Sequence, residues 1–242
     1  MKRKALSLVL CLTLVLSLFA LSAFADGDTL RIAVNMDAPG FDPYTSGYNV
    51  SSAIICRNVY ETLINMDAAG NLYPGLATEW MWGENNMSVV LTLREGVKFT
   101  NGDDFNADAV IFSLRDYRGK TAMGGDGESL FDFDNMVKLD DFKVEIPLKR
   151  AGSDALITLS DMVYSICSPK AAEELGSEYA NNPVGTGPYK FVSFVSGVGA
   201  KMVANENYWG GAPSIKNVET VYIAEASVAQ MELEMGNVDW VT

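Results

Sequence analysis

Residues 181 to 191 read Asn-Asn-Pro-Val-Gly-Thr-Gly-Pro-Tyr-Lys-Phe, a run that places two prolines and two glycines around Thr186. Proline fixes φ at about −65° and has no N–H donor, whereas Gly185 and Gly187 are free to adopt positive φ. The stretch therefore predicts a tight bend, and the alternation after Pro188 predicts a strand. We interpret the bend as the crossover by which the chain re-enters a central sheet; the alternative is that Thr186 or its backbone lines a ligand cleft.

Strand and helix patterns are mixed on both sides of this bend. Period-two alternation predicts strands at residues 30–34, 76–80, 87–94, 142–146, 189–194, 201–204, 218–223 and 238–241. Apolar spacing of three and four residues predicts helices at residues 51–63, 106–114, 155–159, 169–175 and 224–235. Because the two kinds of element do not alternate strictly, the pattern is typical of an α/β fold with a mixed sheet.

Residues 118 to 135 carry several glycines and acidic residues and little apolar periodicity, which predicts a solvated loop. The acidic positions Asp126, Glu128, Asp132 and Asp134 raise the alternative of a calcium site. Because the alternating acidic spacing of a calcium loop is absent, we predict no metal ligand.

The N-terminus predicts export from the cytoplasm. Three basic residues at positions 2 to 4 precede an uncharged run that ends in the small-residue triplet Ala23-Phe24-Ala25. This is the pattern of a secretory signal peptide over residues 1–25, and a retained N-terminal anchor is the alternative. Cleavage after Ala25 implies a secreted protein, in the periplasm or at the outer face of the cytoplasmic membrane.

The chain is strongly acidic. Its net charge is −13, and removal of the three basic residues at positions 2 to 4 changes this to −16 for residues 26–242. Such a charge repels nucleic acid and anionic membrane surfaces, so we predict no nucleic-acid partner. Cys56 and Cys167 remain in a compartment that permits a disulfide, and a bridge between them and two buried free thiols are both open interpretations.

Histidine is absent from the sequence. Its absence excludes Ser-His and Cys-His nucleophile pairs and the histidine-based zinc and iron sites. A carboxylate pair remains available among the 31 acidic residues, but no pattern places two of them in one apolar cleft. We therefore predict no catalytic residue, no cofactor and no enzyme activity, with a secreted carboxylate-dependent hydrolase as the alternative.

Seven segments carry a resemblance to a known family. They are TLRIA at 29–33, NVYETL at 58–63, GNLYPGLATEW at 70–80, LREGVKFTNG at 93–102, FNADAVIFS at 105–113, NPVGTGPY at 182–189 and NENYWGG at 205–211. In these segments and in their order, the chain resembles the extracellular solute-binding proteins of the peptide/nickel type, solute-binding family 5, which serve ATP-driven importers. The absence of histidine makes the nickel-carrying branch the less favoured one.

The resemblance implies a periplasmic-binding-protein-like type II lobe with a mixed sheet and an inserted subdomain. Residues 26–242 would form the N-terminal lobe, with the inserted subdomain at about 48–182 and the central lobe at 26–47 and 183–242. Members of the family enclose their ligand between two lobes and are roughly twice as long as this chain, which ends near the middle of their pattern. We therefore expect the second lobe to be missing and the chain to be truncated.

The resemblance also implies a substrate-binding component of an ABC importer. Such a protein captures peptides or similar small solutes without catalysis and passes them to a membrane permease. Because loops at strand ends tend to face a cleft, we predict ligand contacts in the loop after the first strand and at the crossover. The predicted ligand-binding residues are Asn35, Met36, Asp37, Tyr44, Tyr48 and Thr186. A surface loop with packed tyrosines, and a truncated remnant that binds nothing, are the alternatives.

Overall fold

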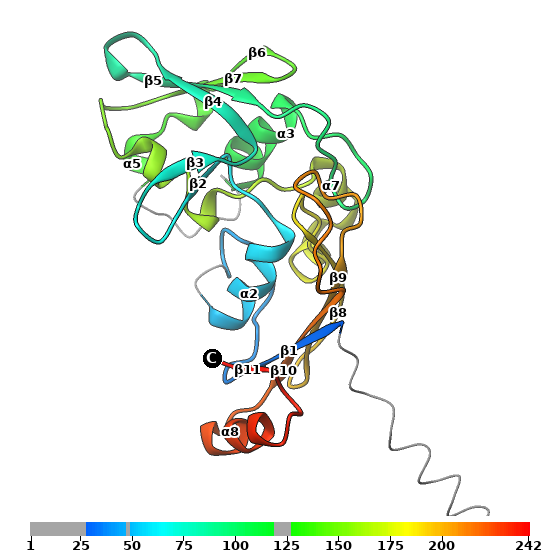
Figure 1. Ribbon diagram of the computed structural model, residues 1–242. Helices are drawn as coiled ribbons and strands as arrows, with labels where there is room; N and C mark the ends of the chain where they lie inside the picture. The colour runs from blue at the N-terminus through cyan, green and yellow to red at the C-terminus, as the bar shows by residue number, and fades with distance from the viewer. Residues whose placement is uncertain (1–27, 47–48, 119–126) are drawn as a thin grey trace, which may run out of the picture.

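The computed structural model describes residues 28–46, 49–118 and 127–242, which build two layered bodies joined end to end (Figure 1). The lower body in that view contains a five-stranded sheet with the strand order β11-β1-β10-β9-β8. Its strands are β1 (Thr29–Val34), β8 (Tyr189–Val195), β9 (Gly199–Ala204), β10 (Asn217–Tyr222) and β11 (Trp240–Val241).

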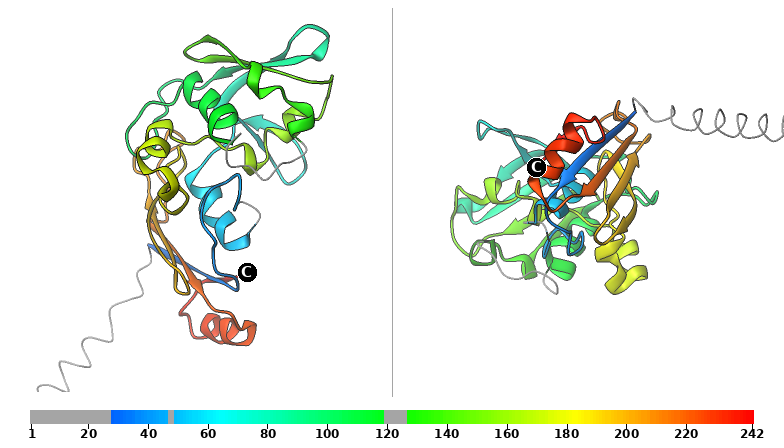
Figure 2. Two further views of the ribbon diagram at one scale, coloured as in Figure 1. Left: turned by 180° about the vertical axis from the view of Figure 1, so that it is seen from behind. Right: turned by 90° about the horizontal axis from the view of Figure 1, so that it is seen from below.

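The five-stranded sheet is mixed, as the sequence predicts. β1 runs parallel to both β10 and β11, while β9 pairs antiparallel with β10 and with β8. Along β1 the side chains alternate between two cores: Leu30 and Ile32 pack on one face, and Ala33 packs on the other. Helix α8 (Ala226–Glu234) covers the Ala33 face, and α2 (Val50–Val59) lies on the opposite side (Figure 2).

Helix α2 is shorter than the predicted helix at 51–63. Its N-cap is Asn49, whose side chain accepts from the Ser52 amide at 3.1 Å. The helix ends at Val59, and the chain continues in extended conformation from Tyr60. Leu63, the last residue of the predicted helix, is buried in the core of the other body.

The upper body holds a four-stranded antiparallel sheet with the order β4-β5-β7-β6, beside the hairpin of β2 and β3. These strands are β2 (Ile64–Met66), β3 (Leu72–Pro74), β4 (Ala77–Trp82), β5 (Ser88–Leu93), β6 (Val137–Asp140) and β7 (Lys143–Pro147). The helical elements beside it are α3 (Ala107–Ile111), a π-helical continuation (Phe112–Tyr117), α5 (Gly127–Leu130) and α6 (Ala155–Thr158). Apolar side chains of strands and helices form one core, which includes Leu91, Val110 and Val144.

The predicted loop at 118–135 is partly wrong. Residues 119–126 lie outside the described residues, and α5 and a short 3-10 helix (Phe133–Asn135) follow them. Leu130 and Phe131 are buried in the upper core, so two adjacent apolar residues fix this segment although it lacks helical periodicity. Among the described residues no acidic cluster forms a metal site, and Asp126 of the calcium alternative is not described.

The boundary between the bodies differs from the one drawn at about 48 and 182. Buried side chains of α2 and of α7 (Pro169–Leu175) share a core with the five-stranded sheet. The upper core takes its residues from Leu63 to Ile166. Helix α7 itself begins as predicted, with Pro169 in its first turn and Ser168 capping the Ala171 amide.

The segment 181–191 is the predicted crossover, leading from the 3-10 turn at Gly176–Asn181 into β8. Its glycines serve close packing, because neither Gly185 nor Gly187 has positive φ. A Cβ atom at Gly185 would lie 2.1 Å from the Val59 carbonyl oxygen, and one at Gly187 would lie 2.5 Å from that of Asn58. The Gly187 amide also donates to the Val59 carbonyl at 2.9 Å, so the crossover packs on the end of α2.

Candidate functional site

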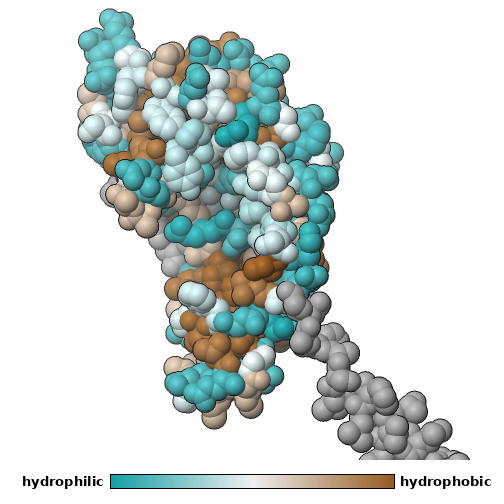
Figure 3. Space-filling model, in the orientation of Figure 1, coloured by the Kyte–Doolittle hydropathy of each residue, from teal (hydrophilic) through white to brown (hydrophobic). Residues whose placement is uncertain are grey.

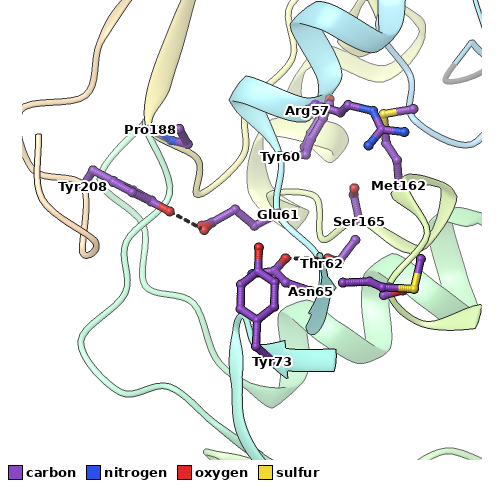
Figure 4. A pocket seen from close by; sticks show the side chains of 12 residues that line it. Arg57, Tyr60, Glu61, Thr62, Asn65, Tyr73, Met162, Ser165, Pro188 and Tyr208 are labelled. Carbon is purple, nitrogen blue, oxygen red and sulfur yellow. Dashed lines mark hydrogen bonds between the residues drawn. The ribbon is translucent and has the colours of Figure 1, made fainter. Parts of the chain in front are cut away.

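A pocket of about 310 Å³ lies between the two bodies, where the end of α2 meets the hairpin of β2 and β3 (Figure 4). Its wall is mostly polar and comes from five separate parts of the chain. The lining residues are Arg57, Tyr60, Glu61, Thr62, Asn65, Met66, Tyr73, Ser160, Met162, Ser165, Pro188 and Tyr208.

The end of α2 positions the first wall of this pocket. Because the crossover packs on the last carbonyls of the helix, the chain leaves it in extended conformation at Tyr60 and points Glu61 toward Tyr208 (Figure 4). Glu61 and Tyr208 belong to the segments NVYETL and NENYWGG, which lie far apart in the sequence.

The Glu61 carboxylate accepts three hydrogen bonds. Thr186 Oγ1 and Trp209 Nε1 donate to Oε2 at 2.7 and 2.9 Å, and the Tyr208 hydroxyl donates to Oε1 at 2.7 Å. Burial raises the pKa of Glu61 above its usual value, and the three hydrogen bonds and the nearby Arg94 charge offset this only in part. The network joins α2, the crossover and the segment after β9 at one point.

Arg94 supports this network from behind. Its guanidinium lies 4.0 Å from the centroid of the Trp209 ring, and its Nε donates to the Gly75 carbonyl at 3.2 Å. A cation over an indole face is an attractive arrangement, so the ring is fixed on one side while its N–H reaches Glu61 on the edge. The pocket wall is therefore held by side chains rather than by the loop backbone alone.

A second, more apolar pocket of about 520 Å³ adjoins the first along α2. It is lined by Ile32, Val50, Ala53, Ile54, Arg57, Asn58, Asp161 and Met162. Arg57 and Met162 line both pockets and lie side by side (Figure 4). In the same orientation as Figure 1, apolar surface gathers over α2 and the sheet (Figure 3). Together the pockets form a groove, hereafter the α2 groove, with one polar and one apolar compartment.

The structure separates the predicted ligand-binding residues. Asn35 and Met36 are exposed, and the Asp37 carboxylate accepts from the Ser196 hydroxyl at 2.5 Å and the Gly197 amide at 3.0 Å. Asp37 therefore ties the loop after β1 to the turn between β8 and β9. None of these three residues lines the α2 groove.

The other predicted contacts are buried or undescribed. Tyr44 is buried, and its hydroxyl donates to the Ser165 carbonyl at 2.6 Å. Thr186 is fully buried, with its hydroxyl bound to Glu61, so it acts on the pocket only through that carboxylate. Tyr48 lies outside the described residues.

Sequence reasoning missed Arg57, Glu61, Tyr73 and Tyr208 as pocket residues. Glu61 and Tyr208 stand in segments that carry the family resemblance, and a charged or aromatic residue inside such a segment was the available signal. Nothing in their spacing shows that the two side chains meet. The contact depends on the crossover, which brings α2 next to the chain after β9.

Cys56 and Cys167 are buried free thiols, so the structure favours the second of the two interpretations. Burial raises the pKa of Cys167 to about 12, and it also raises that of Cys56. They lie with Tyr44 near Asp42, whose pKa is raised by burial although the Tyr44 amide donates to it at 2.8 Å. This cluster is part of the core behind the pocket and contains no activated nucleophile.

Comparison with known families places the chain. The family described as bacterial extracellular solute-binding proteins, family 5 Middle, matches residues 71–242. The chain belongs to this family. Proteins of the family are non-catalytic transport components, which agrees with the expectation that this chain is not an enzyme.

Two named relatives match along most of the chain. The glutathione-binding protein GsiB of Shigella dysenteriae is 29% identical over 232 residues, which cover 94% of this chain and 44% of GsiB. The di/tripeptide-binding protein 2 of Pseudomonas aeruginosa is 29% identical, over 91% of this chain and 46% of that protein. The chain thus spans less than half the length of these relatives.

Solved structures share the fold. The periplasmic binding protein DppA of Helicobacter pylori, in complex with the peptide STSA, superimposes with a TM-score of 0.77 at 24% identity, over 87% of this chain and 45% of DppA. MoaA of Agrobacterium tumefaciens R10, in complex with mannopinic acid, superimposes with a TM-score of 0.81 at 24% identity, over 88% of this chain and 44% of MoaA. The prediction of a periplasmic-binding-protein-like lobe, covering part of the full fold, is confirmed.

Helices long and apolar enough to span a bilayer do not occur among those that the structure describes. The predicted signal peptide at residues 1–25 lies outside the described residues.

Proposed function

We propose that this chain is a substrate-binding component of an ABC importer that captures peptides or similar small solutes outside the cytoplasmic membrane. The observation that carries the proposal is the α2 groove in a member of this family. Its polar compartment offers Asn65, Tyr73 and Ser165, and its apolar compartment offers Val50 and Ile54. A peptide presents backbone amides and apolar side chains together, which these two compartments suit.

The named relatives support the peptide class. GsiB is named for glutathione and the Pseudomonas relative for di- and tripeptides. Neighbouring folds include proteins solved with the dipeptide Met-Leu and with a nonapeptide. A membrane permease is the proposed acceptor of the captured solute. The predicted signal peptide supports a location in the periplasm or at the outer face of the membrane.

A thermal-shift and calorimetry screen of the purified chain tests the proposal. The panel contains glutathione, di- and tripeptides and a nonapeptide, and a ligand at 100 times its Kd adds about 2.7 kcal/mol to the free energy of unfolding. We expect at least one peptide to raise Tm and to be recovered intact by mass spectrometry. Recovery of cleaved peptide supports the hydrolase alternative, and no response to any probe supports the non-binding remnant.

A pair of variants locates the site. Tyr73→Ala removes a half-exposed aromatic ring from the polar compartment, so we expect weaker binding of the responding peptide. Met81→Ala removes an exposed side chain from β4 in the four-stranded sheet and should leave binding unchanged. Equal effects of the two substitutions would place the binding site elsewhere.

A further inference from the structure

Arg57 is a cation in the α2 groove without a protein partner. It lies in the last turn of α2 and is exposed, and within the described residues its guanidinium makes no hydrogen bond or ion pair. Several other basic side chains of this acidic protein do have acidic partners, for example Lys98 with Asp104 and Lys216 with Glu206. Arg57 is thus available to a ligand.

The position of Arg57 is specific. It is one of the two residues that line both compartments, and it is the only cation that lines either of them in the described part of the chain. Its neighbour Met162 is apolar and buried, and the compartment beyond it is walled by Ile32 and Ile54. A group that reaches Arg57 therefore stands at the border between polar and apolar surface.

The acidic side chains of the groove leave this cation unpaired. Glu61 lines the polar compartment, but its two oxygens already accept from Thr186, Tyr208 and Trp209. Asp161 lines the apolar compartment and is exposed, and its Oδ1 accepts from the Val163 amide at 3.0 Å. Neither carboxylate bonds to Arg57 in the structure.

A guanidinium presents a planar fork of donors that matches a carboxylate in two parallel hydrogen bonds. We propose that Arg57 anchors the free carboxylate of the solute, so that the α2 groove selects peptides with a free C-terminus. The C-terminal side chain then occupies the apolar compartment, and the preceding residue lies along the polar one. This inference rests on the proposed function and names the end of the peptide that the described groove recognises.

The test compares a peptide acid with its amide. The probes are Ala-Ala-Leu and Ala-Ala-Leu-amide, which differ only in the charge at the C-terminus. Loss of a charge-assisted hydrogen bond weakens binding by about tenfold or more. We expect Arg57→Gln to raise the Kd of the acid by at least about tenfold and to change the Kd of the amide by less than about twofold. Arg57→Lys keeps the charge but not the planar fork of donors, so its Kd for the acid should lie between those of the wild type and Arg57→Gln.

A matched control is available in Arg31→Gln. Arg31 lies on β1, lines neither pocket, and uses only its backbone in its described hydrogen bonds to Asp239. The substitution removes the same charge from the same body, so long-range electrostatic effects should be alike. We expect Arg31→Gln to leave the Kd values of both probes unchanged within about twofold.

A second measurement separates ligand contact from helix stability. Arginine in the last turn of a helix also interacts favourably with the helix dipole, and Arg57→Gln removes that contribution for every probe. In ¹H–¹⁵N spectra of the wild-type chain, the Arg57 Nε–Hε signal should shift with the acid and not with the amide.

Three results are distinguishable. Equal weakening of acid and amide by Arg57→Gln, or no weakening, overturns the anchor while the proposed function stands. An Nε–Hε signal that ignores the acid overturns it as well. Failure of the wild-type chain to bind either probe or any member of the peptide panel overturns the proposed function, and the anchor with it.

Discussion

Glu61 lines the pocket, and its carboxylate also accepts hydrogen bonds from side chains of three other residues. Its three donors come from Thr186, Tyr208 and Trp209, and two of them share Oε2. The hydroxyl of Tyr208 is the only one of these donors aimed at Oε1, and a hydroxyl is able to accept as well as donate. A glutamine at this position would keep its oxygen at Oε2 and donate its amide to Tyr208.

The two substitutions Glu61→Gln and Glu61→Ala should therefore differ widely. Glu61→Ala leaves the Thr186 hydroxyl and the Trp209 N–H without an acceptor and should cost about 2 to 4 kcal/mol of the free energy of unfolding. Glu61→Gln preserves the three contacts and removes a desolvated charge, so we expect a change below about 1 kcal/mol. Urea denaturation at pH 7 measures both values; equal losses would mean that the negative charge itself is required.

The Glu61 pKa also predicts a pH dependence. Because burial raises this pKa above its unfolded value of 4.5, the folded state favours the protonated carboxyl. The corresponding stability is present below pH 4.5 and is lost as the pH rises through the folded pKa. As the pH rises through this window, the free energy of unfolding of the wild type should fall relative to that of Glu61→Gln. The pKa of Asp42 is also raised, but both proteins contain Asp42, so its contribution cancels in the comparison. A pH-independent difference between the two proteins would contradict the assigned environment.

Gly185 should tolerate no side chain. A methyl group added at this position would have the Val59 carbonyl oxygen as its nearest neighbour, at 2.1 Å, so relief requires movement of α2 or the crossover. We expect Gly185→Ala to lower the free energy of unfolding by about 3 kcal/mol. Gly70→Ala is the control, since Gly70 has positive φ but open surroundings, and it should cost about 1 kcal/mol. Similar losses measured by denaturation would show that the close approach does not matter.

The requirement for glycine in the crossover was predicted from the sequence, but the predicted reason, positive φ, was wrong. Local composition shows that Gly185 and Gly187 stand in a bend, and positive φ is the local reason for glycine. The actual reason is the approach of Val59, a residue distant in the sequence. The same limit applies to Thr186, whose partner Glu61 belongs to a different element.

At the scale of the elements, Asp37 holds the turn between β8 and β9 through hydrogen bonds from Ser196 and Gly197. The pKa of Asp37 is lowered, first by the hydrogen bond from Ser196 and then by the amides of Gly197 and Ala38. The stability that these hydrogen bonds contribute is present above pH 3.8 and is lost as the pH falls through the lowered pKa of Asp37. Because the carboxylate is near the surface, its effect should be local rather than global.

Asp37→Asn tests the role of these hydrogen bonds by hydrogen exchange. The substitution removes the charge that holds the Ser196 hydroxyl and the Gly197 amide, so the Gly197 amide should exchange several-fold faster at about pH 6. The Ala200 amide, which donates to Thr220 Oγ1 at 2.8 Å within the sheet, should keep its protection. Unchanged exchange at Gly197 would show that the turn holds without Asp37.

Elements with local start signals were predicted well. Asn106 caps α3, and the strand patterns at 87–94 and 142–146 correspond to β5 and β7. The end of α2 and the strand β6 were not predicted. Helix α2 stops where the crossover meets it, and β6 has four exposed residues whose strand conformation depends on pairing with β7. Both features are set by neighbours and not by periodicity.

For the whole molecule, the family segments were enough to predict the fold, because together and in their order they resemble a family whose fold is known. They were not enough to predict the α2 groove. Its walls come from β1, α2, the β2–β3 hairpin, residues 160–165, Pro188 and Tyr208, which are distant from one another in the sequence. The loop after β1, which was the predicted contact region, is instead tied to the β8–β9 turn.

The net charge makes a last prediction about the whole chain. With a net charge of −13, repulsion among acidic groups opposes folding, whereas the described ion pairs lie on exposed or half-exposed side chains and contribute at most about 1 kcal/mol each. Raising the ionic strength from about 0.01 M to 0.15 M shortens the Debye length from about 30 Å to 8 Å and should raise Tm by a few degrees.

Two neutralising substitutions sharpen this salt test. Glu79→Gln and Glu84→Gln remove exposed carboxylates that have no described ion-pair partner, so together they should raise Tm at low salt and reduce the response to added NaCl. Lys98→Gln, which breaks an exposed ion pair, should act in the opposite direction. If added salt instead lowers the Tm of the wild type, the attraction within the ion pairs outweighs the repulsion among the acidic groups, and the prediction is wrong.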